Sequence, residues 1–160
     1  MAKKKTKITS AEPVIENRKA RHAYEISETL EVGIKLHGSE VKSVRAGLIS
    51  LAEGYVSATE IPPTLMLHSV HIGEYQPAGA LGHPTVRQRT LLAHKREIVK
   101  LARQMTTKGV TIVPLKLYFK HGFAKLLIGL GTGKSSVDKR ESIKEREHER
   151  DIARALSRRA

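Results

Sequence analysis

Cysteine and tryptophan are absent from this sequence of 160 residues, and its aromatic residues are four tyrosines and two phenylalanines. Without cysteine there is no disulfide framework and no thiolate metal site, which fits a reducing cytosol. So few aromatic rings argue against the base-stacking platform of an RNA-recognition motif. The composition therefore excludes a disulfide-stapled secreted domain and disfavours that one class of RNA reader.

Long apolar segments are also missing. No run of about 18 apolar residues occurs anywhere, and no apolar segment follows the lysines at positions 3, 4, 5 and 7. The helical patterns lack the large aromatic face of an interfacial membrane anchor. We therefore expect no secretion, no membrane partner and a cytoplasmic location.

Positive charge is what the sequence has in excess, with a formal net charge of +13. The first 22 residues contain seven Lys or Arg and two Glu, and residues 134–160 contain nine Lys or Arg and six acids. We expect residues 1–16 to be a mobile basic arm. Residues 134–160 predict a tail that is disordered when free, because it has almost no core-forming residues, and that becomes helical on a partner. A polyanion such as nucleic acid is the expected partner.

Between these ends the pattern is mostly that of strands. Apolar residues alternate over residues 24–36, where Glu28 and Gly33 mark a bend, a bulge or a hairpin. They alternate again over 49–59, 65–72, 113–119 and 124–130. A short helix is predicted at 39–46, capped by Ser39, and a longer one at 86–107. The predicted class is β with small α content: an antiparallel, OB-like barrel of about six strands over residues 17–133, with flanking helices.

Several apparent active-site motifs fail on spacing. The segment 129–135 (GLGTGKS) lacks the first glycine of a phosphate loop, and His68 and His71 point to opposite faces of a strand. No nucleophile with a base, carboxylate pair or metal cluster assembles, so we expect no cofactor and no enzyme activity. A structural ribosomal component and an RNA-processing enzyme remain as alternative interpretations. For the basic helix faces, the alternative to RNA binding is an ordinary solvent-exposed surface.

Five segments nevertheless occur together in a characteristic order. They are 17–24 (NRKARHAY), 38–47 (GSEVKSVRAG), 91–98 (LLAHKREI), 113–119 (VPLKLYF) and 138–147 (DKRESIKERE). In these segments the sequence resembles the SmpB family, the SsrA-binding proteins of bacteria. The resemblance covers residues 17 to 147, which is most of the chain.

The resemblance implies an OB-type barrel that binds the tRNA-like domain of transfer-messenger RNA and brings it to stalled ribosomes. Elongation factor Tu with GTP is implied as an indirect partner. Combined with the basic clusters, the resemblance predicts this RNA-binding set: Asn17, Arg18, Arg21, Glu31, Lys42, Arg45, Arg87, Arg89, Leu91, His94, Lys95, Arg96 and Lys134. For Glu31 two roles stay open, acceptance of a hydrogen bond from RNA or a salt bridge that positions a neighbouring cation.

A second set is implied to face the ribosome. The resemblance places His22 at the decoding centre of the small subunit and the tail as a helix in the empty messenger-RNA channel. Local sequence does not decide whether His22 stacks on a base or merely ends a strand. The predicted contacts of this set are His22, Asp138, Lys139, Arg140, Ile143, Lys144, Arg146, Arg150, Ile152 and Arg154.

Overall fold

The computed structural model describes residues 12–157 of the chain. Most of the predicted arm, residues 1–11, lies outside the described residues. At its end, β1 (Ile15–Glu16) pairs antiparallel with β8 (Val110–Lys120), and Glu16 lies 3.8 Å from Lys116 in an ion pair. The ordered body therefore begins before residue 17, where the sequence had placed the boundary.

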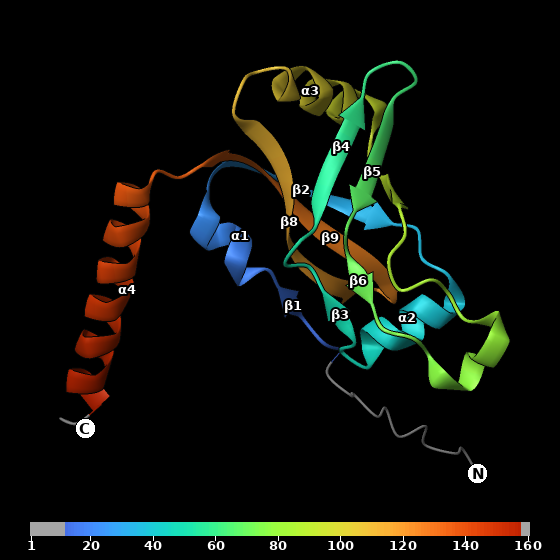
Figure 1. Ribbon diagram of the computed structural model, residues 1–160, viewed down its shortest axis with the longest axis horizontal. Helices are drawn as coiled ribbons and strands as arrows, with labels where there is room; N and C mark the ends of the chain where they lie inside the picture. Colours follow the sequence, from blue (N-terminus) through green and yellow to red (C-terminus); the bar gives the residue numbers. More distant parts are fainter. Residues whose placement is uncertain (1–11, 158–160) are drawn as a thin grey trace, which may run out of the picture.

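Six antiparallel strands close into a ring, as the sequence predicted (Figure 1). The ring runs β8, β4 (Tyr55–Thr59), β5 (Thr64–His68), β7 (Arg89–Leu92), β2 (Tyr24–Ile34) and β9 (Phe123–Gly133), and the pairing of β9 with β8 completes it. A separate two-stranded sheet joins β3 (Ile49–Ser50) to β6 (His71–Ile72). Closure leaves the ring strands paired on both sides, which removes the exposed edges of an open sheet.

The interior of the ring is filled by the inward residues of the alternating patterns. Val32, Val56, Leu67, Leu117 and Leu126 are each at most 1% exposed. The register between β2 and β9 shifts between Ile26 and Glu28, so the predicted bulge at Glu28 is confirmed. Period-two patterning therefore identified the strands that build the core.

The predicted helix over residues 86–107 is wrong in its first half. Residues Arg89–Leu92 form strand β7, and α3 spans only Lys95–Met105. Arg89 and Leu91 point inward while Leu92 points outward, which is a strand's period rather than a helix's. The helix starts at His94, whose N–H donates to the Glu97 carboxylate at 3.0 Å.

Two predicted strands are also shorter than expected. Residues 49–59 divide into β3 and β4, and residues 65–72 divide into β5 and β6. Ser69 has a positive φ of 56°, which turns the backbone out of the strand between the latter pair. A 3-10 helix, η1 (Gln76–Leu81), lies in the Gly- and Pro-rich segment that follows β6.

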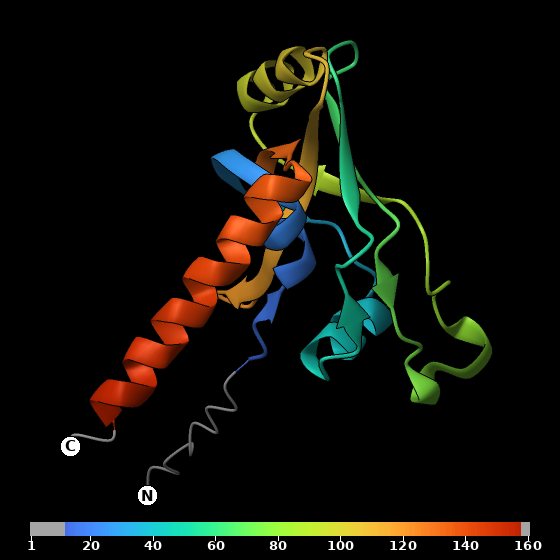
Figure 2. The same cartoon turned by 60° about the vertical axis from the view of Figure 1, so that its left-hand side comes forward.

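The remaining helices flank the ring. Helix α2 (Gly38–Arg45) matches the predicted short helix, but its N-cap residue is His37 and not Ser39; the His37 N–H donates to the Glu40 carboxylate at 2.7 Å. The short α1 (Arg18–Ala23) was not predicted. Helix α4 (Ser136–Ser157) projects from the body beside α1 (Figures 1 and 2). No helix among residues 12–157 is both long and apolar enough to cross a membrane.

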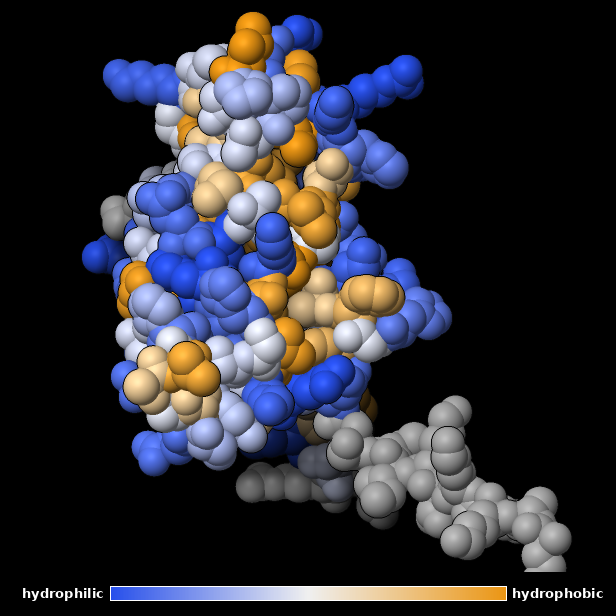
Figure 3. Space-filling view, turned by 90° about the vertical axis from the view of Figure 1, so that its right-hand side faces the viewer, coloured by the Kyte–Doolittle hydropathy of each residue, from blue (hydrophilic) through white to orange (hydrophobic). Residues whose placement is uncertain are grey.

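Apolar and charged residues are unevenly distributed over the surface. On the side that carries β5 and η1, apolar residues form a band bordered by strongly hydrophilic groups (Figure 3). The large exposed apolar residues of the chain include Leu81, Val86 and Leu48. The apolar surface on this side is thus bounded by hydrophilic residues.

Candidate nucleic-acid interface

Asn17 anchors helix α1 to the body. Its Oδ1 accepts from the Ala20 N–H at 3.0 Å, and its Nδ2 donates to the carbonyls of Leu51 at 2.8 Å and Pro114 at 2.9 Å. The side chain is buried and its polar atoms are bonded within the protein. In the protein alone these bonds hold α1 in place, and a contact of Asn17 with RNA stays a prediction.

Helix α1 and helix α4 form a basic groove. We call it the α1–α4 groove; it has a volume of about 560 Å³ and is lined by Arg18, Arg21, Lys134, Ser142, Glu145, Arg146, Glu149 and Arg150. His22 Nδ1 lies 3.3 Å from an Nη of Arg146. The structure thus brings together residues that the sequence had assigned to two different RNA partners.

Two of the predicted RNA-binding arginines instead form a buried ionic cluster with Glu40. Arg89 is fully buried; its Nε donates to Glu40 at 2.8 Å and its Nη1 to the Val70 carbonyl at 2.8 Å. Arg87 makes two further bonds to Glu40, at 2.9 and 2.5 Å. Both of these donor groups face the interior, so Arg89 has a structural role in the protein alone, and its contact with RNA stays a prediction.

Glu40 is ionised inside this cluster. Burial by itself raises the pKa of a carboxyl group, but bonds from Arg87, the His37 N–H and Arg89 outweigh it and lower the pKa of Glu40 to about 2. One carboxylate thereby joins α2 to β7 and to the segment before it. The cluster fixes the orientation of α2, on which Lys42 and Arg45 are exposed.

The cations of α2 are held over aromatic rings. Lys42 Nζ lies 4.9 Å from the centre of the Tyr75 ring, and the Arg45 guanidinium lies 5.1 Å from that of Phe119. Arg45 also pairs with Glu12 at 3.6 Å. At the start of α3 the predicted RNA-binding residues are likewise exposed: His94, Lys95 and Arg96.

Glu31 lies on the outer surface of the ring and is already bonded. It accepts from the Tyr118 hydroxyl, and Lys120 Nζ lies 3.5 Å away. The bond to Tyr118 lowers the pKa of Glu31, and the same bond raises the pKa of Tyr118 to about 12. In the protein alone Glu31 thus has the positioning role that the sequence had left open, although it remains exposed.

The leucine beside Glu31 is not the predicted one. Leu91 is 2% exposed and belongs to the core, whereas Leu92 is 58% exposed. Leu92 pairs with Gly33, which on its other side pairs with Lys125. We define the Glu31 face as Glu31, Leu92, Tyr118, Lys120 and Lys125. The structure thus places Leu92, and not Leu91, on the outer surface, because in a strand one residue changes the face.

We expect the two leucines to respond oppositely to alanine. Leu91→Ala should lower the free energy of unfolding by about 2–5 kcal/mol, because it opens a cavity in the core. Leu92→Ala should change stability by about 0.5 kcal/mol or less and weaken RNA binding about tenfold. Urea denaturation and a filter-binding titration measure the two effects, and equal destabilisation by both variants would contradict the assigned faces.

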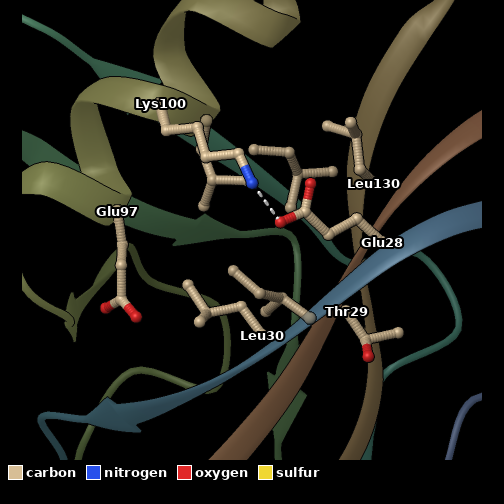
Figure 4. Close-up of a pocket in the computed structure, with 9 residues that line it drawn as sticks. Glu28, Thr29, Leu30, Glu97, Lys100 and Leu130 are labelled. Carbon is tan, nitrogen blue, oxygen red and sulfur yellow. Dashed lines mark hydrogen bonds and ion pairs between the residues drawn. The ribbon is translucent and has the colours of Figure 1, made fainter.

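The cavity beneath α3 is not part of the basic surface. It has a volume of about 150 Å³ and apolar walls that include Leu30, Leu101 and Leu130 (Figure 4). At its rim Lys100 Nζ lies 2.5 Å from Glu28, and this bond, with one from Gln104, lowers the pKa of Glu28. An apolar cavity with an acidic rim does not suit phosphate, and its ion pair helps to hold α3 on the ring.

The predicted ribosome-facing residues of the tail all lie on α4. Ser135 caps this helix, because its hydroxyl accepts from the Asp138 N–H at 3.2 Å. In return the Asp138 carboxylate accepts from the hydroxyl of Ser135 at 2.7 Å and from its N–H at 3.1 Å, and these bonds lower the pKa of Asp138. Ile143 and Ile152 are 42% and 47% exposed. The structure describes the segment as one helix, while its unfolding in the free protein and its helical form on the ribosome stay predictions.

A closed antiparallel ring with separate basic surfaces defines a nucleic-acid-binding protein of the OB-like class. Among residues 12–157 no group of three or more histidine, aspartate or glutamate residues is arranged to hold a metal ion. The chain belongs to the SmpB family, whose model, described as "SmpB protein", matches residues 14–158.

Relatives and a solved structure agree with this assignment. The chain is 49% identical over 156 residues to an SsrA-binding protein of Levilactobacillus brevis, covering 98% of both chains. It is 51% identical over 141 residues to an SsrA-binding protein of Lactobacillus acidophilus, covering 88% of this chain and 92% of the relative. A solved structure described as "tmRNA-SmpB: a journey to the center of the bacterial ribosome" matches with a TM-score of 0.65 at 43% identity, over 78% of this chain and 86% of that one.

Proposed function

We propose that this protein is an RNA-binding adaptor for trans-translation. It binds the tRNA-like domain of transfer-messenger RNA and delivers that RNA to ribosomes stalled on messages without a stop codon. The support is its membership of the SmpB family together with close relatives named as SsrA-binding proteins. Such an adaptor works in the cytoplasm and needs no catalytic group of its own.

The separation of two surfaces along one strand carries the proposal. At one end of β2, Tyr24 pairs with Gly133, and the α1–α4 groove lies beside that end. Seven residues further along β2 is Glu31, on the order of 23 Å away at about 3.3 Å per residue. A rigid ring of this length can hold transfer-messenger RNA at the Glu31 face while α4 contacts the ribosome, and the α1–α4 groove carries residues predicted for both partners.

Helix α4 supplies the part of the proposal that concerns the ribosome. Its 22 residues give a length of about 33 Å, at 1.5 Å per residue. We propose that it lies in the messenger-RNA channel when the channel is empty, with His22 at the decoding centre. A message in the channel would exclude the helix and so prevent rescue of a ribosome that is still translating. Elongation factor Tu with GTP is then an indirect partner, held through the RNA.

A binding experiment tests the proposal directly. The purified protein should bind the isolated tRNA-like domain and bind an unrelated hairpin of equal length much more weakly. Sequencing of the RNA that co-purifies with the protein from cells should identify transfer-messenger RNA as the enriched species. Tight binding to ribosomes without binding to the tRNA-like domain would overturn the proposal and favour a structural ribosomal component.

Salt should weaken the complex in a predictable way. Because lysine and arginine release counterions from phosphates, log K should fall by roughly 0.7–0.9 for each phosphate neutralised, per unit of log salt concentration. Fluorescence anisotropy from about 50 to 300 mM KCl measures the slope. An affinity that does not change over this range would contradict an electrostatic interface.

A further inference from the structure

Two rings stack on each other on the outer face of the β4–β5 hairpin. Tyr55 and His68 are cross-strand partners, their ring centroids are 4.9 Å apart, and their planes differ by 10°. His68 is held in this position by a 2.7 Å hydrogen bond between its Nε2 and the Ser57 hydroxyl. Tyr55 nevertheless remains 48% exposed. The pair is thus a pre-formed stack with aromatic surface still available.

The exposed part of Tyr55 faces a cleft. The cleft has a volume of about 350 Å³ and lies between α1 and strands β4 and β8. Tyr24 contributes a second ring to its lining, and the small residues Ala20 and Ala23 line its α1 side. Two of the four tyrosines of the chain therefore line one cleft, although they are 31 positions apart in the sequence. Rings and small residues around a space of this size suit a flat aromatic group.

The rim of the cleft is charged. Lys19 and Glu53, both mostly exposed, form an ion pair there. Arg18 lies next to Lys19 on α1 and faces the α1–α4 groove. A ligand with a flat aromatic ring and a phosphate could stack on the tyrosine rings and pair its phosphate with these cations. Glu53 is able to accept a hydrogen bond from an amino group on a base.

We propose that this cleft receives an unpaired purine base of RNA, which stacks on Tyr55 while Lys19 binds the adjoining phosphate. A purine extends the existing His68–Tyr55 stack by a third ring. The inference rests on the proposed RNA-binding function and adds a base-binding site to it. This site is distinct from the Glu31 face and from the α1–α4 groove.

The four tyrosines allow a direct test by NMR. The protein is labelled with 3-fluorotyrosine, its four ¹⁹F signals are assigned with single Tyr→Phe variants, and tetra-adenylate is added. The signals of Tyr24 and Tyr55 should shift most, that of Tyr118 on the Glu31 face should shift less, and that of Tyr75 should not shift. An abasic tetranucleotide of equal charge should cause little shift. Equal shifts at all four tyrosines, equal shifts with the abasic compound, or no shift would each overturn the proposal.

Affinity measurements on variants complete the test. Tyr55→Ala should weaken tetra-adenylate binding about fivefold or more, which is near the lower end of the contribution of one stacked base, whereas Tyr55→Phe should stay within about twofold. Phe123→Ala removes another exposed ring and serves as the control, with no loss expected. If Tyr55→Ala does not fold, the NMR result on the unsubstituted protein decides.

Testing the tRNA-like domain and tetra-adenylate in the same buffer distinguishes failure of this proposal from failure of the function on which it rests. Wild-type protein that binds the tRNA-like domain but shows no shift at Tyr24 or Tyr55 with tetra-adenylate refutes only the base-binding cleft. Wild-type protein that binds neither RNA refutes the proposed function as well.

Discussion

Glu40→Gln should lower the free energy of unfolding by about 3–5 kcal/mol, the usual cost of removing one member of a buried ion pair. Glu40 is fully buried and is the carboxylate that Arg87 and Arg89 share. Its replacement by a neutral amide leaves the charge of Arg89 uncompensated in the interior. Urea unfolding followed by circular dichroism at 222 nm measures the change.

A matched control is available on the surface. Glu53 is ion-paired with Lys19, but both side chains are mostly exposed. Because solvent screens such pairs, Glu53→Gln should change the free energy of unfolding by about 1 kcal/mol at most. A Glu40→Gln variant as stable as the Glu53→Gln variant would show that the cluster does not hold α2 to β7.

The cluster also gives stability a dependence on acid pH. The pKa of Glu40 is about 2 in the folded protein and 4.5 without these interactions. A carboxyl group with a depressed folded pKa stabilises the protein fully above its unfolded pKa, and the stabilisation disappears as pH falls towards the folded pKa. The loss should therefore run from about pH 4.5 to about pH 2, be on the order of 3 kcal/mol, and be absent in Glu40→Gln.

Removal of residues 136–160 should abolish tagging of the unfinished peptide on a stalled ribosome. It should leave the affinity for RNA within about fivefold of that of the intact protein. The deleted segment has eight basic and six acidic residues, so its net charge is only +2. The Glu31 face lies on the ring and is left intact. Affinity for the tRNA-like domain and tagging in a reconstituted translation system measure the two effects.

A point variant tests whether the tail must be helical, because it disrupts the helix without changing the charge of the tail. Ser142 lies in the interior of α4. Ser142→Pro should break the helix there, at a cost of about 3 kcal/mol, and abolish tagging, whereas Ser142→Ala should retain it. Loss of RNA affinity on deletion, or full tagging by Ser142→Pro, would contradict a tail that acts as a helix on the ribosome.

Strands could be predicted from the sequence where the apolar pattern is long and local. The strands of 11 residues, β2, β8 and β9, show sustained alternation, and His121-Gly122 forms the turn between β8 and β9. It failed at β7, where four residues are too few to show a period and one of the inward residues is an arginine. Burial of the Arg89 charge is possible because Glu40, 49 positions earlier in the sequence, forms an ion pair with it in the interior.

The functional surfaces also divide into parts that local sequence predicted and parts that depend on contacts distant in sequence. The exposed cations of α2 and α3 were correctly placed outside by their positions opposite apolar stripes. Helix α1 was missed because it has six residues and depends on the bonds of Asn17 to Leu51 and Pro114, 34 and 97 positions away. The cleft at Tyr55 was missed for a similar reason, since Tyr24 and Tyr55 are brought to it by different strands, β2 and β4.

The sequence by itself determined the net charge, the antiparallel strands, the polar C-terminal segment and the family, because composition, local period and motif order are properties of the chain in one dimension. Only the tertiary structure decided which charges face solvent and which are neutralised inside, and which of two adjacent leucines is exposed. Burial and ion pairing depend on partners that are distant in sequence, and an alternating strand exposes a different face when its phase moves by one residue.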